Sequence, residues 1–453
     1  MVLKEAATLG REMGRVIIAS LAVAASLAIP AASATAAGGG WSKPSTLAPA
    51  GQPAYQPSTA IAANGTAVVV WDQYNATKNK YTLMGAIRTP RGKITKSKLG
   101  PAANAFAKPA LAVGGDGTFA VAWEYPGASA TLSALAVRIL PAGKKGFGAT
   151  AKVSGRNLSN GYGYGDSPSI AVDDAGDVFV AYEARVGSHY EAMETQKPKR
   201  ARRWSRAVRL SAAGVDSHGA RLAADGKGAV VVAWDDPAGS VWSAGKPSAA
   251  GSFSAPQKIA SATYETSPAD VAIADSGKAA VLWEQSRPHG TYLIASKVGH
   301  SRFPGKAQYL SAKGISRYQG LALSSNGAGV AAWEEEVAGG WQIKAATLTA
   351  AGSSWSKETR IIPAGYAATF GAAPVVAANN QRAVIAWSEK NLHHASFVGV
   401  RVRVGSRWSK VTAFSGLNTP VVAVPNDPKK SGPVAGAMIW LSTSGLQISI
   451  LKP

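Results

Sequence analysis

The sequence repeats one short pattern eight times, with 49 to 59 residues between successive copies. In each copy, an apolar segment that ends near an alanine is followed by a polar turn and by a second apolar segment that ends in an aromatic residue. These aromatics are Trp71, Trp123, Tyr182, Trp234, Trp283, Trp333, Trp387 and Trp440. A unit of this size cannot bury its apolar face alone, so the copies are expected to pack on one another, as in a propeller or a solenoid.

The recurring alanine and the turn after it indicate the innermost strand of a blade. The alanines are Ala62, Ala112, Ala171, Ala223, Ala272, Ala322, Ala377 and Ala423. A side chain this small fits a strand that is crowded by its neighbours, as where blades converge on an axis. Turns such as Asn64-Gly65 and Asp116-Gly117 tolerate the positive φ angles that tight hairpins require.

The second apolar segment is continuous rather than alternating, as in Val230 to Trp234. Continuous apolarity indicates a strand that is covered on both faces. Two further strands complete each copy. No segment of the mature chain has the pattern of a helix. Four antiparallel strands in each of eight copies predict an all-β fold, a β-propeller.

The two ends of the mature chain indicate how the ring closes. The chain begins with a lone fourth strand, Trp41 to Leu47, and ends after a third strand, Leu446 to Leu451. The first strand can therefore complete the last blade and leave no free sheet edge. We predict a single eight-bladed propeller, with seven blades as the alternative if the degenerate last copy lies outside the ring.

The N-terminus has the order of a secretory signal peptide. Arg11 and Arg15 precede the apolar run 16–30, and the small-residue pattern Ala32-Ser33-Ala34 follows. We therefore expect residues 1–36 to be removed, residues 37–453 to form the propeller domain, the protein to be secreted, and no membrane span to remain. The chain has no cysteine, which excludes disulfides, thiol catalysis and Cys-ligated metals.

The Ala, Gly and Trp pattern resembles that of secreted bacterial β-propeller repeat proteins, and loosely that of the sialidase-like group. This resemblance implies the propeller fold. The chain has no Asp-box, Ser-x-Asp-x-Gly-x-x-Trp, and no arginine triad can be placed on one face from the sequence. Sialidase catalysis is therefore not carried over.

An acidic residue follows the terminal aromatic in six copies. These residues are Asp72, Glu124, Glu183, Asp235, Glu284 and Glu334. They are expected near the rim that also holds the loops entering the inner strands. There they could bind a cation, a cationic ligand or sugar hydroxyls, or two of them could act as an acid and a base. The alternative is that each acidic residue caps its blade by accepting hydrogen bonds from the next blade.

Aromatic residues occur in the loops that enter the inner strands: Tyr55, Tyr162, Tyr164, Tyr264, Tyr318, Tyr366 and Phe370. Aromatic rings near carboxylates are a common way to hold sugars. These rings could instead pack the loops onto the blades. Of the seven, we select Tyr162, Tyr164, Tyr264 and Tyr318 as candidate ligand-binding residues.

The chain is strongly basic, with 48 Lys and Arg against 26 Asp and Glu and a net charge of +22. Basic residues gather at the turns between third and fourth strands, and the densest group is Lys197, Lys199, Arg200, Arg202, Arg203 and Arg206. Those turns belong to the rim opposite the six acidic residues. Clustered positive charge attracts anionic polymers, and outside a cell these are wall polymers and acidic polysaccharides more than nucleic acid.

Two classes of function remain. The first is a secreted, non-catalytic binding or scaffold protein for a glycan or an anionic cell-surface polymer. The second is a glycoside hydrolase or polysaccharide lyase that acts through rim carboxylates. An enzyme should break the symmetry of the repeats with unique charged residues, whereas a binder should present equivalent pockets or a charged face. The histidines lack metal-ligand spacing, so we expect no cofactor or metal, no specific nucleic-acid partner, and a monomer.

Overall fold

The fold is described from a computed structural model of the chain. It describes residues 40–452 apart from 104–107, 127–132, 155–166, 262–265, 288–290, 312–313, 339, 363–366, 369–372, 391–395, 417 and 427–433. The expected signal peptide therefore lies outside the described residues. All regular elements in the described part of the chain are strands.

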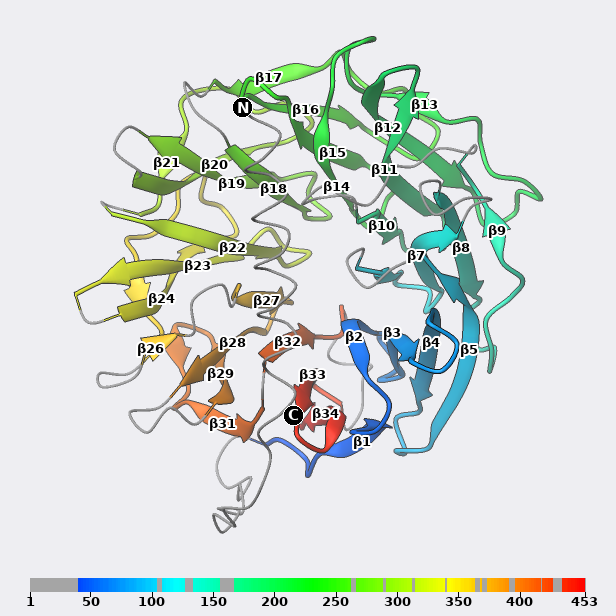
Figure 1. Cartoon of the computed structure of the whole chain (residues 1–453). Helices are drawn as coiled ribbons and strands as arrows, with labels where there is room; N and C mark the ends of the chain where they lie inside the picture. The colour runs from blue at the N-terminus through cyan, green and yellow to red at the C-terminus, as the bar shows by residue number, and fades with distance from the viewer. Residues whose placement is uncertain are drawn as a thin grey trace, which may run out of the picture. The chain divides into compact units, whose positions relative to one another are not determined.

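The strands form eight antiparallel blades in a ring, so the predicted eight-bladed propeller is confirmed (Figure 1). The innermost strands, from blade 1 to blade 8, are β2 (Ala54–Ile61), β6 (Ala110–Val113), β10 (Ser169–Val172), β14 (His218–Ala224), β18 (Thr266–Ile273), β22 (Ser316–Leu323), β27 (Val375–Ala378) and β32 (Asn418–Ala423). The second strands are β3 (Ala67–Asn75), β7 (Phe119–Pro126), β11 (Val178–Val186), β15 (Val230–Asp235), β19 (Ala279–Arg287), β23 (Gly329–Val337), β28 (Arg382–Lys390) and β33 (Gly436–Ser442).

The outer half of each blade consists of a third and a fourth strand. The third strands are β4 (Lys80–Arg88), β8 (Ser133–Leu140), β12 (His189–Lys197), β16 (Val241–Lys246), β20 (Thr291–Gly299), β24 (Gly340–Leu348), β29 (Ser396–Val404) and β34 (Gly445–Leu451). The fourth strands are β5 (Ile94–Ala102), β9 (Ala151–Lys152), β13 (Val208–Arg209), β17 (Gln257–Ala260), β21 (Gln308–Tyr309), β25 (Thr359–Arg360), β31 (Thr412–Ser415) with the short β30 (Arg407–Trp408), and β1 (Ser45–Pro49).

The innermost strands touch one another in sequence around the whole ring. Each contacts the innermost strand of the next blade, and β32 of blade 8 contacts β2 of blade 1. A strand with an inner neighbour on each side has little room for large side chains. The alanine that recurs at its end meets this restriction in all eight blades.

The apolar core lies between neighbouring blades rather than within any one of them. The eight terminal aromatics of the second strands are at most 5% exposed. One cluster joins Val68 and Leu83 of blade 1 to Phe119 and Trp123 of blade 2. The continuous apolar second strands are thus covered on both faces, as their composition predicts.

The first strand of the chain completes the last blade. β1 pairs antiparallel with β34, with Thr46 opposite Gln447. The Ser449 hydroxyl donates to the Ser42 carbonyl oxygen at 2.7 Å, which extends the pairing before β1 begins. Regular pairing covers Ser45–Pro49 rather than the expected Trp41 to Leu47, although Trp41 forms an isolated bridge with Leu451.

Blades 6 and 7 depart from the pattern of separate sheets. The short strand β26 (Ala367–Ala368) pairs with Trp341 of β24 on one side and with β28 on the other. The two blades therefore share one sheet. In the described part of the chain, no helix is long and apolar enough to cross a membrane.

Candidate functional site

Antiparallel blades place their turns on two opposite rims. We call the rim with the turns between first and second strands and between third and fourth strands the basic rim. The other rim, with the turns between second and third strands, is called the opposite rim. The end of each second strand, and so each of the six acidic residues, lies toward the opposite rim.

The six acidic residues are all buried, with exposures of 8% or less. Two of them contact the next blade directly. The Ala220 backbone N–H donates to Glu183 Oε1 at 3.2 Å, and Arg317 Nε lies 3.7 Å from Glu284 Oε1. These two contacts are of the kind expected of blade caps, and none of the six presents an open carboxylate on the surface.

Asp72 is almost fully buried, and its Oδ1 atom, like Asp235 Oδ1, has no hydrogen-bond partner among the described residues. Burial, together with the nearby charge of Glu124, raises the pKa of Asp72 to about 8. A carboxyl group in this setting holds its proton at neutral pH, because a buried charge without a partner is unfavourable.

Of the four candidate tyrosines, the structure describes one. Tyr162, Tyr164 and Tyr264 lie outside the described residues. Tyr318 is half-buried in β22 and has a left-handed backbone, with a φ of 53°. Its neighbour Arg317 stacks on the ring of Tyr292, with its guanidinium carbon 3.7 Å from the ring centroid.

The basic cluster occupies the turn between β12 and β13 on the basic rim. Arg200, Arg202, Arg203 and Arg206 are exposed, whereas Lys197 is half-buried and donates to the Ala201 carbonyl at 2.6 Å. The four arginines therefore present their charge to solvent.

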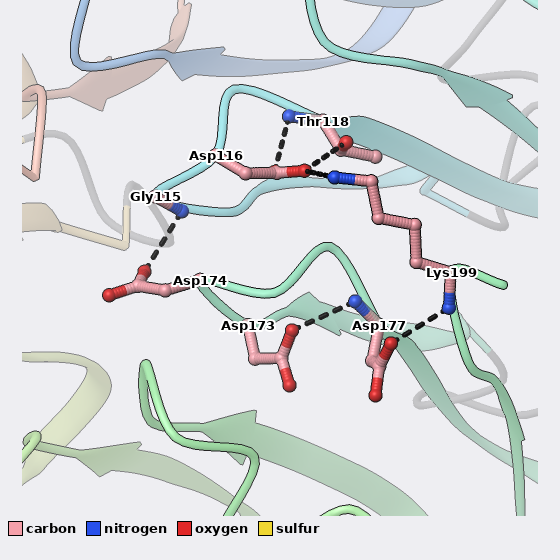
Figure 2. Close-up of polar contacts among 7 residues, drawn as sticks. All are labelled: Gly115, Asp116, Thr118, Asp173, Asp174, Asp177 and Lys199. Atoms are coloured by element: carbon pink, nitrogen blue, oxygen red, sulfur yellow. Dashed lines mark hydrogen bonds and ion pairs between the residues drawn. The ribbon is translucent and has the colours of Figure 1, made fainter.

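Lys199 is exposed but is held by the neighbouring blade. Its Nζ lies 2.7 Å from Asp116 Oδ2, and its backbone N–H donates to Asp177 Oδ1 at 2.7 Å (Figure 2). Burial alone would raise the pKa of Asp116. The Lys199 ammonium and hydrogen bonds from Thr118 outweigh this effect and lower the pKa.

A cavity of about 300 Å³ opens beside this turn, between blades 2 and 3. Its wall is mainly apolar and includes Val137, Ile139 and the half-buried Trp204, while Lys197 and Lys199 stand at its edge. Asp116 neutralises the charge of Lys199, so Lys197 supplies the net positive charge beside this apolar wall. Such a site can accept a ring that carries an anionic substituent.

A belt of aspartate and asparagine side chains lies on the basic rim and has no signal in the local sequence. In blades 3, 5 and 7 such a side chain accepts a hydrogen bond from a backbone N–H in the first turn of the preceding blade. The three bonds run from Gly115 to Asp174, from Gly226 to Asp275 and from Asn326 to Asn380, each at 2.9 Å. Figure 2 shows the first of them.

Glycine supplies the donor in two of the three bonds of the belt, at Gly115 and Gly226. A Cβ atom on Gly115 would lie 2.1 Å from Asp174 Oδ1, so glycine is needed there. Burial and the charge of Asp275 raise the pKa of Asp174. The turn 173–177, whose composition faintly resembles a calcium loop, is a hairpin turn in which Asp173 Oδ1 accepts from the Asp177 N–H at 2.8 Å.

The belt surrounds a cavity of about 760 Å³ that is lined by the first turns of several blades, with Asp116, Asp174, Asp225 and Asp275 among the lining residues. The basic rim is therefore acidic at its centre and basic at its edge. No group of three or more metal-ligating His, Asp or Glu side chains occurs among the described residues.

Two charged residues break the symmetry of the inner strands. The position two residues before the recurring alanine is small or apolar in six blades but holds Arg221 in blade 4 and Asp270 in blade 5. Asp270 Oδ2 accepts from the Leu321 N–H of blade 6 at 3.2 Å. Burial raises the pKa of Asp270, while the charges of Arg221 and Lys108 oppose this rise. An alignment of the eight copies shows this exception in the sequence itself.

No protein-family model matches the sequence, and no curated protein matches it. Solved structures of similar fold include an ulvan lyase of polysaccharide lyase family PL25, which is 10% identical, with a TM-score of 0.50 over 80% of this chain and 97% of its own. The NanB sialidase from Streptococcus pneumoniae is 11% identical, with a TM-score of 0.37 over 83% of this chain and 69% of its own. The β-propeller domain of the trilobed protease from Pyrococcus furiosus is 8% identical, with a TM-score of 0.43 over 77% and 92%.

These similarities concern the fold. The ulvan lyase, with a TM-score of 0.50, supports a shared fold. At this level of identity, the residues of the site have to be interpreted from their own geometry.

The buried Asp72 predicts a pH dependence of stability. The pKa of Asp72 rises from 3.8 in the unfolded chain to about 8 in the folded chain. The contribution of Asp72 to the free energy of unfolding is therefore complete below about pH 4 and is lost as the pH rises through about 8. Asp72→Asn keeps the neutral form at every pH. At pH 9 the variant should be more stable than wild type by a few kcal/mol, at about 1.4 kcal/mol for each pKa unit. At pH 5 the difference should fall to about 1 to 2 kcal/mol.

Thermal unfolding followed by circular dichroism at both pH values measures this difference. Glu336→Gln, which neutralises an exposed acid, is the control and should change little at either pH. A variant that is no more stable than wild type at pH 9 would contradict a buried, protonated Asp72.

Proposed function

We propose that the protein is a secreted binding protein for anionic polysaccharides or related anionic polymers of the cell surface. The observation that carries this proposal is the cavity between blades 2 and 3, in which the apolar wall with Trp204 meets Lys197 and Lys199 at the edge. Exposed arginines of the β12–β13 turn extend the positive charge beyond the cavity. This arrangement suits a sugar ring with a carboxylate or sulfate group and a chain that continues across the rim.

The chemistry of the rim supports binding better than cleavage. The six acidic residues that the sequence offers as an acid and base pair are at most 8% exposed. A general acid or base has to lie within hydrogen-bond reach of the substrate, directly or through one water. Cations at a surface need only attract and orient a polyanion, which exposed arginines do through charge-assisted hydrogen bonds.

Removal of the arginine charge tests the proposal. Arg202, Arg203 and Arg206 changed together to Gln should weaken binding to immobilised polygalacturonate or dextran sulfate by about tenfold or more at about 50 mM salt. The change should also reduce the loss of binding between about 50 and about 200 mM salt, because fewer counterions are released. Affinity measured by biolayer interferometry at several salt concentrations reports both effects.

The matched control removes the same charge from the opposite rim. Lys78, Lys80 and Arg185 are exposed there, and their joint change to Gln should leave binding nearly unchanged. Equal losses in the two variants would mean that net charge alone attracts the polymer. Absence of retention of the wild-type protein at about 50 mM salt would refute an anionic ligand.

The charged pair of the inner strands favours a second candidate function, cleavage of a glycan by hydrolysis or elimination. Arg221 and Asp270 are unique among the eight equivalent positions, and unique charges are the mark expected of a catalytic site in a repeat protein. If the protein only binds its ligand, the wild-type protein should release neither reducing ends nor unsaturated products from anionic polysaccharides. Turnover that is lost in Asp270→Asn and kept in Glu336→Gln would establish the second function instead.

A further inference from the structure

Three tyrosines come together on the opposite rim of blade 1. Tyr55 lies at the start of β2, Tyr74 near the end of β3 and Tyr81 at the start of β4. The ring centroids of Tyr55 and Tyr81 are 6.2 Å apart, with an interplanar angle of 68°. Those of Tyr74 and Tyr81 are 4.8 Å apart at 36°. We call these three residues the tyrosine cluster.

The tyrosine cluster presents an aromatic side chain to solvent. Tyr55 is 38% exposed, and the only other aromatic among the exposed large apolar residues of the described chain is Tyr309, at 43%. Tyr309 is covered by the guanidinium of Arg287, which lies 4.6 Å from the ring centroid. Tyr55 has no such cation over its ring among the described residues, so its ring is available to a ligand.

The backbone at the cluster is strained in two places. Only three non-glycine residues with left-handed φ angles occur in the described chain, and two of them are Gln56, at 48°, and Asn79, at 47°. Gln56 follows Tyr55 at a bulge in the pairing of β2 with β3, and the corresponding bulge of blade 4 has a glycine, Gly219. Tyr318 holds the equivalent bulge position of blade 6, so the bulge is a feature of the repeat, and in blade 1 it sets the direction of Tyr55.

One amide side chain, that of Asn79, contacts the tyrosine cluster, and its Oδ1 accepts from the Tyr74 hydroxyl at 2.9 Å. The Gln73 side chain lies on the other face of the blade sheet, because Gln73 is opposite Thr82 whereas Tyr74 is opposite Tyr81. Gln73 Nε2 donates to Gln52 Oε1 at 3.2 Å. Amides offer donors and acceptors without net charge. The exposed Lys78 and Lys80 lie in the same turn, and their charge disfavours a cationic ligand over these rings.

We infer that the tyrosine cluster binds a neutral sugar ring, with the apolar C–H face of the sugar on Tyr55 and its hydroxyls on Asn79 and the tyrosine hydroxyls. The C–H face of a pyranose is apolar and slightly positive, and it therefore packs on the negative face of an aromatic ring. The Asn79 amide and the tyrosine hydroxyls can pair with sugar hydroxyls as donors and acceptors. This site lies on the rim opposite the arginine-rich turn and does not depend on the anionic ligand proposed above.

Titration of the full mature protein with neutral oligosaccharides tests the inference. Cellohexaose, mannohexaose and chitohexaose are the probes, and heat of binding is measured in about 1 M salt, where surface charge is screened. At least one probe should bind. Tyr55→Ala should weaken its affinity by about tenfold, and Tyr55→Phe should keep it, because the stacking ring remains. Tyr309→Ala removes the other exposed aromatic and should have no effect.

The following results would contradict a neutral-sugar site at the tyrosine cluster. Absence of binding for all three probes, or equal weakening by Tyr55→Ala and Tyr309→Ala, overturns the inference. Binding of choline in place of the sugars, lost in Tyr55→Ala, would replace it with an aromatic cage for a quaternary ammonium group. Unfolding midpoints of the variants show whether a loss reflects folding. Because this binding persists in high salt, its failure is distinguishable from failure of the salt-sensitive binding at the basic rim.

Discussion

The pairing of β1 with β34 is the contact on which the rest of the propeller depends. The two strands come from opposite ends of the chain, and only their pairing gives the last blade its fourth strand. Each blade shares its apolar core with its neighbours, so an incomplete blade would expose the side of the next. The pairing therefore completes blade 8 and closes the ring where β32 of blade 8 meets β2 of blade 1.

Charged groups between blades reinforce the apolar contacts at several points. Lys246 of blade 4 is buried and lies 3.0 Å from Glu194 Oε1 of blade 3, and it also donates to Gln196 Oε1 at 2.6 Å. The aspartate and asparagine belt joins the first turns of successive blades on the basic rim. Buried ionic and polar contacts of this kind demand defined partners, because removal of one member leaves the other unsatisfied. The blades are thereby held in one register, and the cavity between blades 2 and 3 keeps its lysines at its edge.

The fold could be predicted from the sequence because each blade repeats the same pattern of buried apolar residues and tight turns. Trp71 and Trp333 are buried for the same reason, and Asn64-Gly65 and Asn326-Gly327 turn in the same way. The sites were harder to predict, because they depend on neighbours across blades. Nothing near Asp174 in the sequence indicates that its partner is Gly115, and the burial of Asp72 follows from packing. The tyrosine cluster joins three strands, whereas the exception at Arg221 and Asp270 could have been read from the alignment of the copies.

A single covalent bond tests ring closure most directly. Thr46 and Gln447 lie opposite each other, with Thr46 Oγ1 and Gln447 Oε1 3.3 Å apart, and the chain has no native cysteine. The double variant Thr46→Cys, Gln447→Cys should form an intramolecular disulfide on mild oxidation. The denatured monomer should then migrate faster without reductant, while neither single variant should do so. A double variant that stays reduced, or that forms only disulfide-linked dimers, would contradict a ring closed by these two strands.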